Sequence, residues 1–413
     1  MPEKSVDPKF DAPNETLEGS ARSQAAEAVS RRKMFGAAAI TGLGAAAVWT
    51  RVAAAAPPQD QRKEDEKPKI EPIANFKYDL EKQTHWVGPG GSAKEATVEE
   101  FPVSESMAGV SMRLDPGAIR ELHWHTLAAE WAYMIEGKVR TTVIMPTGQA
   151  EQTDFGVGDT WYFPRGHGHV LQNIGNTPAH FLLVFDNGHF SEFGTFDVSD
   201  WLSTTPPRIL ARNLNLPESA FAQFPKKQLY IGPGRVPPPV EDFRNKDLQW
   251  FQATHKYRLD LQPPKTFEGG REHIVSVKEF PIQTTMTAVK MVIQPGGLRE
   301  MHWHPHADEW QYYLKGRSRI RVFGSHGRWR EDEFGPGQVA FIKQGYGHYV
   351  EQLGDEPTEI LVLFNHPEFQ EISLSNWLGG NPVSILETNF PGVSRDMIDK
   401  LPLVERGIIG KKA

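Results

Sequence analysis

Residues 117–137, GAIRELHWHTLAAEWAYMIEG, decide the fold, because they return at residues 296–316 as GGLREMHWHPHADEWQYYLKG. The two stretches are displaced by 179 positions. Working outward, the same displacement relates Phe76-Lys77-Tyr78 to His255-Lys256-Tyr257 and Phe190 to Phe369. Self-similarity maintained over more than a hundred residues indicates that the chain holds two copies of one domain.

The register between the copies breaks at one loop. Beyond Phe190 the best match pairs Trp201 with Trp377, a displacement of 176, so the first copy has three extra residues there. The longer loop begins Ser191-Glu192-Phe193-Gly194-Thr195. The two copies therefore differ at a defined place while both flanks of that place agree.

Each copy is rich in predicted strands. Residues 138–145 and 318–323 alternate polar and apolar side chains in part, and turns containing Gly, Pro and Asp separate such segments. Many short strands of this kind predict an all-β barrel or sandwich. Helical patterns follow each predicted barrel, at residues 217–224 and 394–401.

A group of possible metal ligands is repeated in the two copies. On a strand, side chains two residues apart share a face, so each His-Trp-His places two imidazoles on the inside and the tryptophan outside. Three imidazoles and one carboxylate suit an octahedral Mn(II) or Fe(II), and Zn, Ni and Cu are also compatible with these ligands. The candidate ligands are His123, His125, Glu130 and His169 in the first copy, and His302, His304, Glu309 and His348 in the second.

Composition narrows the possible functions. The chain of 413 residues has no cysteine, which leaves histidine and carboxylate as its strong metal ligands. Its formal net charge of −7 provides no basic surface, so no nucleic-acid partner is expected.

The N-terminal segment has the features of an export signal. Ser30-Arg31-Arg32-Lys33 precedes a moderately apolar run rich in Ala and Gly, which is typical of a twin-arginine (Tat) signal. The run is shorter than the about 20 apolar residues of a membrane-spanning helix. We therefore expect a periplasmic or secreted protein with no membrane span in its mature form.

The repeated stretches, together with residues 156–173, GVGDTWYFPRGHGHVLQN, resemble the two motifs of the cupins, and the span from Phe76 to Ile408 resembles the two-domain (bicupin) oxalate decarboxylases. This resemblance implies two tandem double-stranded β-helix (jelly-roll) barrels, each followed by short helices. The expected domains are a signal at 1–56, a linker at 57–74, a first cupin at 75–230, a linker at 231–250 and a second cupin at 251–413.

The resemblance also implies an activity. It implies conversion of oxalate to formate and CO2, with two Mn(II) ions per chain (Fe being the alternative), with O2 as co-catalyst and with no net redox change. It implies a homo-oligomer, a trimer or hexamer. Arg120 and Arg299 are expected at the substrate, although they lie three residues before the first histidine ligands and so on the opposite strand parity.

The longer loop resembles the family's active-site lid. Glu192 then corresponds to the glutamate that takes a proton from oxalate and returns it to carbon, and Thr195 to a substrate-binding lid residue. We expect the first site to be catalytic and the second to be structural or to assist electron transfer, because Glu371 lies in the shorter loop.

Three other functions remain open at this stage. An oxalate oxidase would produce H2O2 on the same scaffold, and the presence of Glu192 argues against it. A cupin dioxygenase acting on another substrate would need an apolar pocket, whereas the paired arginines favour a small anion. A cupin without catalytic activity would need no metal ligands. Near the ligands, His167 is expected to be a loop residue, and Trp124 and Trp303 to pack on the barrels.

Overall fold

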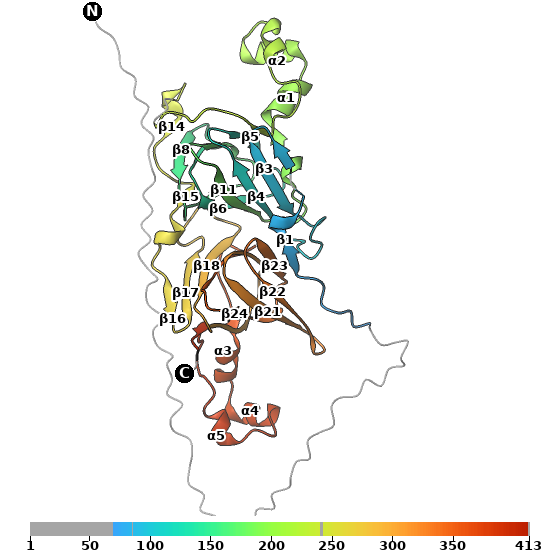
Figure 1. The fold of residues 1–413 in the computed structure, drawn as a ribbon, viewed down its shortest axis with the longest axis vertical. Coiled ribbons are helices and arrows are strands. Elements are labelled where there is room, and N and C mark those ends of the chain that lie inside the picture. Colours follow the sequence, from blue (N-terminus) through green and yellow to red (C-terminus); the bar gives the residue numbers. More distant parts are fainter. Residues whose placement is uncertain (1–68, 85, 240–242, 412–413) are drawn as a thin grey trace, which may run out of the picture. The chain divides into compact units, whose positions relative to one another are not determined.

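Short strands separated by turns form most of the structure, as the alternating sequence pattern predicts. The computed structural model describes residues 69–84, 86–239 and 243–411, all of which belong to one unit, Asp60–Ala413. Figure 1 shows two barrels in succession along the chain, the first coloured blue to green and the second orange to brown. The prediction of an all-β fold with two barrels is confirmed.

The first barrel consists of two seven-stranded sheets, ordered β15-β9-β6-β11-β4-β3-β2 and β12-β5-β10-β7-β8-β14, with β13 beside β5. Its strands are β2 (Trp86–Gly88), β3 (Gly91–Ala96), β4 (Ala108–Leu114), β5 (Ile119–Trp124), β6 (Glu130–Glu136), β7 (Val139–Ile144), β8 (Ala150–Phe155), β9 (Thr160–Phe163), β10 (Gly168–Asn173), β11 (Ala179–Phe185), β12 (Phe196–Asp197), β13 (Ile231–Gly232), β14 (Gln249–Trp250) and β15 (Lys256–Tyr257).

The second barrel repeats this plan with sheets ordered β1-β23-β20-β25-β18-β17-β16 and β22-β21-β24-β19-β26, with β27 beside β19. Its strands are β1 (Lys77–Asp79), β16 (Lys265–Phe267), β17 (Gly270–Val275), β18 (Thr287–Ile293), β19 (Leu298–Trp303), β20 (Glu309–Lys315), β21 (Arg317–Gly324), β22 (Arg328–Phe334), β23 (Gln338–Ile342), β24 (Gly347–Leu353), β25 (Thr358–Phe364), β26 (Ile372–Ser373) and β27 (Ile408–Ile409).

The two repeats exchange their leading strands. Strand β1 precedes the first repeat, yet it pairs with β23 of the second barrel, Tyr78 lying opposite Val339. In return β15, at the start of the second repeat, pairs with β9 of the first barrel, Lys256 lying opposite Trp161. Each barrel therefore needs a strand from the other repeat to complete its sheet.

A shared apolar core joins the barrels. It contains buried aromatic side chains from both repeats, among them Trp131 and Tyr133 of β6 and Trp310 and Tyr312 of β20. Because burial of apolar surface contributes roughly 25 cal/mol per Å2, this common core stabilises both barrels together. Two further cores fill the interiors of the individual barrels.

Short helices follow each barrel. The helices after the first are α1 (Val198–Thr204), α2 (Pro207–Leu214) and the 3-10 turn η4 (Glu218–Gln223); those after the second are α3 (Leu374–Gly379), α4 (Val383–Asn389) and α5 (Arg395–Ile398). The expected helices at 217–224 and 394–401 correspond to η4 and α5. The other four helices are too short for their periodicity to stand out in the sequence.

The segment expected to link the barrels is partly structured. It contains β13, the 3-10 turn η5 (Lys246–Leu248) and β14, and its two strands pair with β5 and β8 of the first barrel. The expected export signal, residues 1–56, lies outside the described residues, as does most of the linker at 57–74. Among the residues that the structure describes, no helix has the length and apolar character to cross a membrane.

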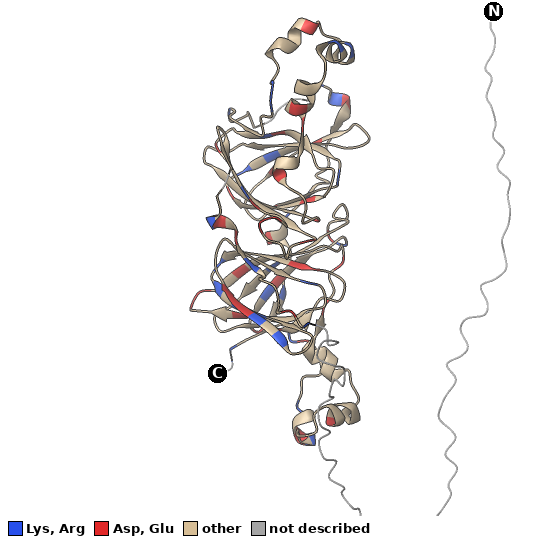
Figure 2. Ribbon diagram, turned by 90° about the vertical axis from the view of Figure 1, so that its right-hand side faces the viewer, with Lys and Arg blue, Asp and Glu red and all other residues tan. Residues whose placement is uncertain are grey.

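Charged residues of both signs lie close together along the strands, as Figure 2 shows for the second barrel. Across the β21–β22 ladder, for example, Arg319 pairs with Glu333 at 2.8 Å and Arg321 with Glu331 at 2.8 Å. These exposed pairs contribute little to stability, because solvent screens them. They do neutralise that surface locally.

A substitution at the contact between the barrels tests the shared core. Gly109 of β4 lies against Trp310, and a Cβ atom at this position would be 2.2 Å from the indole ring. We expect Gly109→Val to lower the free energy of unfolding by about 1–3 kcal/mol through overpacking, measured from the denaturant midpoint. Gly392→Ala, at an exposed glycine with open space around it, is the control. Equal stability of the two variants would contradict the assigned contact.

Candidate metal centres

The His-Trp-His segment of the first barrel lies at the end of β5 and points its histidines inward. His123 and His125 are buried, whereas Trp124 between them is half-buried and packs on Trp201 outside the barrel. This is the alternation that the strand pattern predicts. In the second barrel, Trp303 packs in the same way on Trp377.

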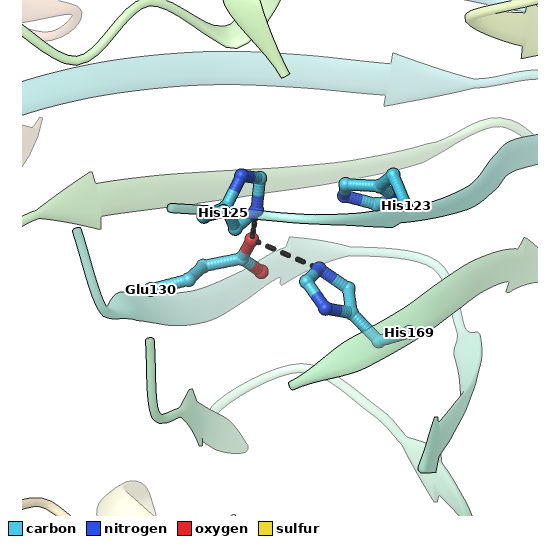
Figure 3. A group of neighbouring side chains, drawn as sticks. All are labelled: His123, His125, Glu130 and His169. Carbon is cyan, nitrogen blue, oxygen red and sulfur yellow. Dashed lines mark hydrogen bonds and ion pairs between the residues drawn. The ribbon is translucent and has the colours of Figure 1, made fainter. Parts of the chain in front are cut away.

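Two other strands complete the first group of ligands. Glu130 is the first residue of β6, and His169 of β10 lies directly across from His123 in the ladder between β10 and β5. Figure 3 shows the four side chains converging inside the barrel. Their ligand atoms all lie within 4.8 Å of one another. The predicted grouping of these four residues is therefore what the structure contains.

The ligand atoms of the first site have the arrangement expected around a cation. Glu130 Oε2 lies 2.8 Å from His125 Nε2 and 3.4 Å from His169 Nε2. The Nε2 atoms of His123 and His169 are buried and have no hydrogen-bond partner. Buried nitrogen atoms without partners are unfavourable unless a ligand satisfies them, so a bound metal ion fits this site.

The outer nitrogens of two of the three histidine ligands orient their rings. His123 Nδ1 lies 2.5 Å from the carbonyl oxygen of Glu121, and His169 Nδ1 lies 2.9 Å from that of His167. Donation from Nδ1–H leaves the lone pair on Nε2, the tautomer that binds a metal. His167 thus contributes its backbone to the site. Its ring lies outside the ligand group, as expected for a loop residue.

Burial and charge set the protonation of these ligands. Burial, aided by the positive charge of Arg120, holds the pKa of His123 well below its ordinary value, so its imidazole is neutral. Burial alone would raise the pKa of Glu130, but the imidazoles of His169 and His125 hold that pKa below its ordinary value. Trp161 Nε1 donates to Glu130 Oε1 at 2.6 Å and fixes the carboxylate.

The second barrel contains an equivalent group with a different support for its carboxylate. His302, His304, Glu309 and His348 offer ligand atoms within 4.8 Å of one another. Glu309 Oε2 lies 3.1 Å from His304 Nε2 and 3.0 Å from His348 Nε2. Here Gln311 Nε2 donates to Glu309 Oε1 at 2.6 Å, in place of the tryptophan of the first site.

A β-bulge places both arginines on the same face as the ligands. Between β5 and β10, His123 lies opposite His169 but Arg120 lies opposite Leu171, so β5 has one extra residue. The same shift separates Arg299 from His302 in β19. The extra residue reverses the side-chain parity, which resolves the conflict between strand alternation and the expected position of these arginines.

Arg120 is completely buried between two carboxylates. Its Nε lies 2.6 Å from Glu192 Oε1 and its Nη1 lies 2.7 Å from Asp197 Oδ1. The guanidinium carbon lies 4.3 Å from the centre of the Tyr230 ring. Its Nη2 is buried and has no hydrogen-bond partner. The guanidinium therefore keeps one donor for a further group.

Arg299 of the second site has a different environment. Its Nε lies 3.0 Å from Glu272 Oε1, its Nη2 contacts Glu371, and its Nη1 donates to the carbonyl oxygen of Gly407. All three nitrogens thus have partners. The adjoining cavity, lined by Glu272, Arg299 and three of the four ligands, measures about 20 Å3, room for about one water molecule.

The longer loop of the first repeat lies against Arg120, beside the first site. Its centre forms a 3-10 turn, η3 (Glu192–Gly194), which is capped by Ser191 and buries Glu192 completely. Glu192 Oε2 has no partner. Thr195 Oγ1 donates to the carbonyl oxygen of Glu192 at 2.7 Å, so this hydroxyl stabilises the turn. A role of Thr195 and Arg299 in substrate binding stays a prediction.

Several residues of the site were not identified from the sequence. Asp197, Tyr230, Glu95 and Glu272 all lie beside the arginines or the lid. An alignment of the two copies would have pointed to two of them, because each copy has a glutamate where the other has an apolar residue. The displacement of 179 sets Ala93 against Glu272 and Glu95 against Ile274. The contacts of Asp197 and Tyr230 depend on the folding of the lid and of the segment after it.

Comparison with known proteins places these features among the cupins. The profile of the family described as Cupin matches residues 79–220 and again 258–391. Oxalate decarboxylase OxdC of Bacillus subtilis (strain 168) is 38% identical over 344 residues, 82% of this chain and 88% of that protein. A probable oxalate decarboxylase of Arthroderma benhamiae is 32% identical over 317 residues, 76% of this chain and 78% of its own length.

The solved structures give the same result. A structure of Bacillus subtilis oxalate decarboxylase, described in work on its Mn(II) centres, superposes with a TM-score of 0.78 at 36% identity. The superposition covers 83% of this chain and 90% of the Bacillus subtilis chain. A structure of the same enzyme at pH 4.6 has a TM-score of 0.77 at 37% identity, with 83% and 89% coverage.

Metal content tests the assignment of the ligands. We expect the purified chain to bind two metal ions and His169→Ala to retain one, because three remaining ligands in the first barrel hold a divalent ion poorly. Elemental analysis after dialysis measures this content. His167→Ala, two residues away, is the matched control and should retain two ions. If His169→Ala also retained two, the first ligand group would be wrong.

Proposed function

The chain belongs to the cupin family, and within it to the two-barrel oxalate decarboxylases, and we propose that it converts oxalate to formate and CO2 at its first metal site. Relatives named as oxalate decarboxylases align with most of the chain, both barrels included. We propose Mn(II) in both sites, since each offers three imidazoles and a carboxylate and a similar structure is described with Mn(II) centres. When bound, and with O2 as co-catalyst, the metal supplies Lewis acidity and electron transfer.

The unpaired donor of Arg120 is the observation that carries this proposal. Oxalate is a small anion without a hydrogen on carbon, so its site needs a positive charge beside the metal. Arg120 lies on the ligand face of β5 and keeps Nη2 without a partner. A guanidinium N–H held in a buried site binds a carboxylate strongly, because a charge-assisted hydrogen bond there is not weakened by water.

The second site lacks such a donor. The guanidinium of Arg299 is surrounded by Glu272, Glu371 and the Gly407 carbonyl. An anion that entered the second site would have to displace Glu272 or Glu371 from Arg299. The negative charge of the displaced carboxylate would then repel the anion. We therefore assign substrate binding and catalysis to the first site, and a structural or electron-transfer role to the second.

Glu192 handles the proton in this proposal. Oxalate bound as its monoanion gives its acidic proton to Glu192, the bond between the two carbons breaks, and one CO2 leaves. Glu192 then returns the proton to the remaining carbon, giving formate, so that atoms and charge balance without net oxidation. The buried Oε2 of Glu192, which has no partner, is the atom available for this transfer.

Assembly and export complete the proposal. We propose a homo-oligomer, a trimer or hexamer, since large aromatic side chains remain exposed at matched positions, Trp201 at 62% and Trp377 at 57%. We also propose export by the twin-arginine pathway to the periplasm or the medium, on the basis of Arg31 and Arg32.

Substituting the lid glutamate tests the proposed reaction. Glu192→Gln keeps the size of the side chain and removes its ability to accept a proton, so formate production should fall about 100-fold or more. The share of oxalate oxidised to CO2 with formation of H2O2 should rise, because the carbon is no longer protonated. Parallel assays of formate and peroxide on the manganese-loaded protein measure both effects.

Glu371→Gln in the second site is the matched variant for this experiment. It should keep formate production within about twofold of the unsubstituted chain, since Glu272 still pairs with Arg299. Full formate production by Glu192→Gln, or its loss only in Glu371→Gln, would contradict the assignment. Peroxide as the main product of the unsubstituted chain would indicate an oxalate oxidase instead.

Export has a separate test. Replacing Arg31 and Arg32 together by lysine keeps the charge but removes the arginine pair that the pathway's receptor recognises. We expect the full chain with both substitutions to remain in the cytoplasm of a bacterial host, while the unsubstituted chain appears outside it. Fractionation and immunodetection measure the distribution. Equal export of the two chains would exclude this route.

A further inference from the structure

A buried carboxylate of the barrel wall contacts the lid from beneath. Glu95 lies on β3, is 4% exposed, and its Oε2 accepts a hydrogen bond from Ser191 Oγ at 2.9 Å. The backbone of Glu192 lies close enough to this carboxylate to lower its pKa. The other oxygen, Oε1, is buried without a partner. A buried carboxylate is costly, so one that accepts its hydrogen bond from the lid needs an explanation.

Ser191 connects the barrel wall to the turn that carries Glu192. Its hydroxyl oxygen accepts from the backbone N–H of Phe193 at 3.2 Å and so caps η3, while its proton points to Glu95. The next residue, Glu192, faces Arg120 on the opposite side. Glu95 and Arg120 thus hold the lid from two sides, at neighbouring residues.

The second repeat lacks this arrangement. The residue equivalent to Glu95 is Ile274, which has no polar group for a loop to bind. There the loop is held instead through a metal ligand, because His304 Nδ1 donates to the Gln370 carbonyl oxygen at 2.8 Å. The carboxylate beneath the loop is therefore specific to the repeat with the longer loop.

We propose that Glu95 is a positioning residue for the reaction, latching the lid through the Ser191 hydroxyl and so holding the Glu192 carboxylate over the first metal site. The importance of this latch for catalysis rests on the proposed role of Glu192. Its effect on the lid itself does not, because the contacts between Glu95 and the lid exist whatever the substrate is.

Solvent can reach the latch. A cavity of about 530 Å3 is lined by Glu95, Ser191, Phe193 and Gly194, together with Lys94 and Glu99. Glu192 does not line this cavity, since it points to the other side of the lid. Glu95 can therefore exchange its proton with water without opening the metal site.

The protonation of Glu95 links the latch to pH. Burial, then the charges of Glu192 and Glu100, raise the pKa of Glu95 to about 7. The hydrogen bond from Ser191 and the nearby backbone of Glu192 act in the opposite direction. Of the other groups nearby, the phenol of Tyr230 stays neutral, because burial and the neighbouring carboxylates raise its pKa, and Lys94 pairs with Glu81 at 3.2 Å.

The direction of the pH dependence follows from this raised pKa. In an open lid Glu95 would have the ordinary value of about 4.3, so closing the lid favours the protonated carboxyl. The contribution of Glu95 to closure is fully present below that ordinary value and is lost as pH rises through about 7. Above about pH 7, the negative charge of Glu95 is repelled by the negative charge of Glu192 across the lid.

Hydrogen exchange tests the latch in the full metal-loaded chain. The exchange of a peptide spanning residues 191–195 is measured without oxalate and is corrected for the intrinsic pH dependence of exchange. The unsubstituted protein should lose lid protection about tenfold between about pH 6 and about pH 8. Glu95→Gln, which still accepts a hydrogen bond but has no charge, should show no such change. Glu99→Gln, in the same cavity, is the control and should behave as the unsubstituted protein.

Two variants separate the latch from general damage to the barrel. At about pH 6, Glu95→Ala and Ser191→Ala should each show the low lid protection that the unsubstituted protein reaches only at about pH 8, and the second leaves the barrel wall intact. The alkaline limb of the kcat profile should move upward in Glu95→Gln, with KM for oxalate little changed. A tenfold pH effect retained in Glu95→Gln, or full protection in Ser191→Ala, would overturn the latch. Failure of Glu192→Gln to affect formate would instead refute the proposed reaction.

Discussion

A guanidinium sealed inside the first barrel is the interaction on which the rest of the structure depends. Arg120 is completely buried, and a buried charge is stable only where partners satisfy it. Glu192 and Asp197 provide the charges, and Tyr230 provides an aromatic face. One of these partners belongs to the lid, so the lid supplies part of the negative charge that stabilises the arginine. Oxalate, a carboxylate itself, suits the donor that remains.

The two barrels show how one scaffold supports two different sites. Both hold three histidines and a glutamate within the same limits, and both carry an arginine on a bulged strand. The two sites differ in the positions of the carboxylates that pair with the arginines. At Ala93 the first barrel has too short a side chain to reach its arginine, whereas Glu272 at the equivalent position occupies Arg299 from the rigid strand β17. The first arginine depends on a loop, and the second is held by the wall.

The sequence predicts much of this arrangement because its signals are local. Strand alternation places the paired histidines of each His-Trp-His on one face, and the repeat identifies all eight ligands. The bulge beside Arg120 left no recognisable pattern, so parity alone placed that arginine on the wrong face. Asp197, Tyr230 and the exchange of β1 and β15 depend on contacts between residues far apart in the chain. Periodicity carries no information about such contacts.

Of the two arginines, Arg120 alone keeps an unpaired donor, and we propose that oxalate binds at the first site for this reason. Oxalate binding by chains with a single intact metal site, measured by calorimetry without O2, tests it most directly. We expect His348→Ala, with its first site intact, to bind one oxalate per chain, and His169→Ala, with only the second site intact, to bind none. Binding by His169→Ala and none by His348→Ala would contradict it.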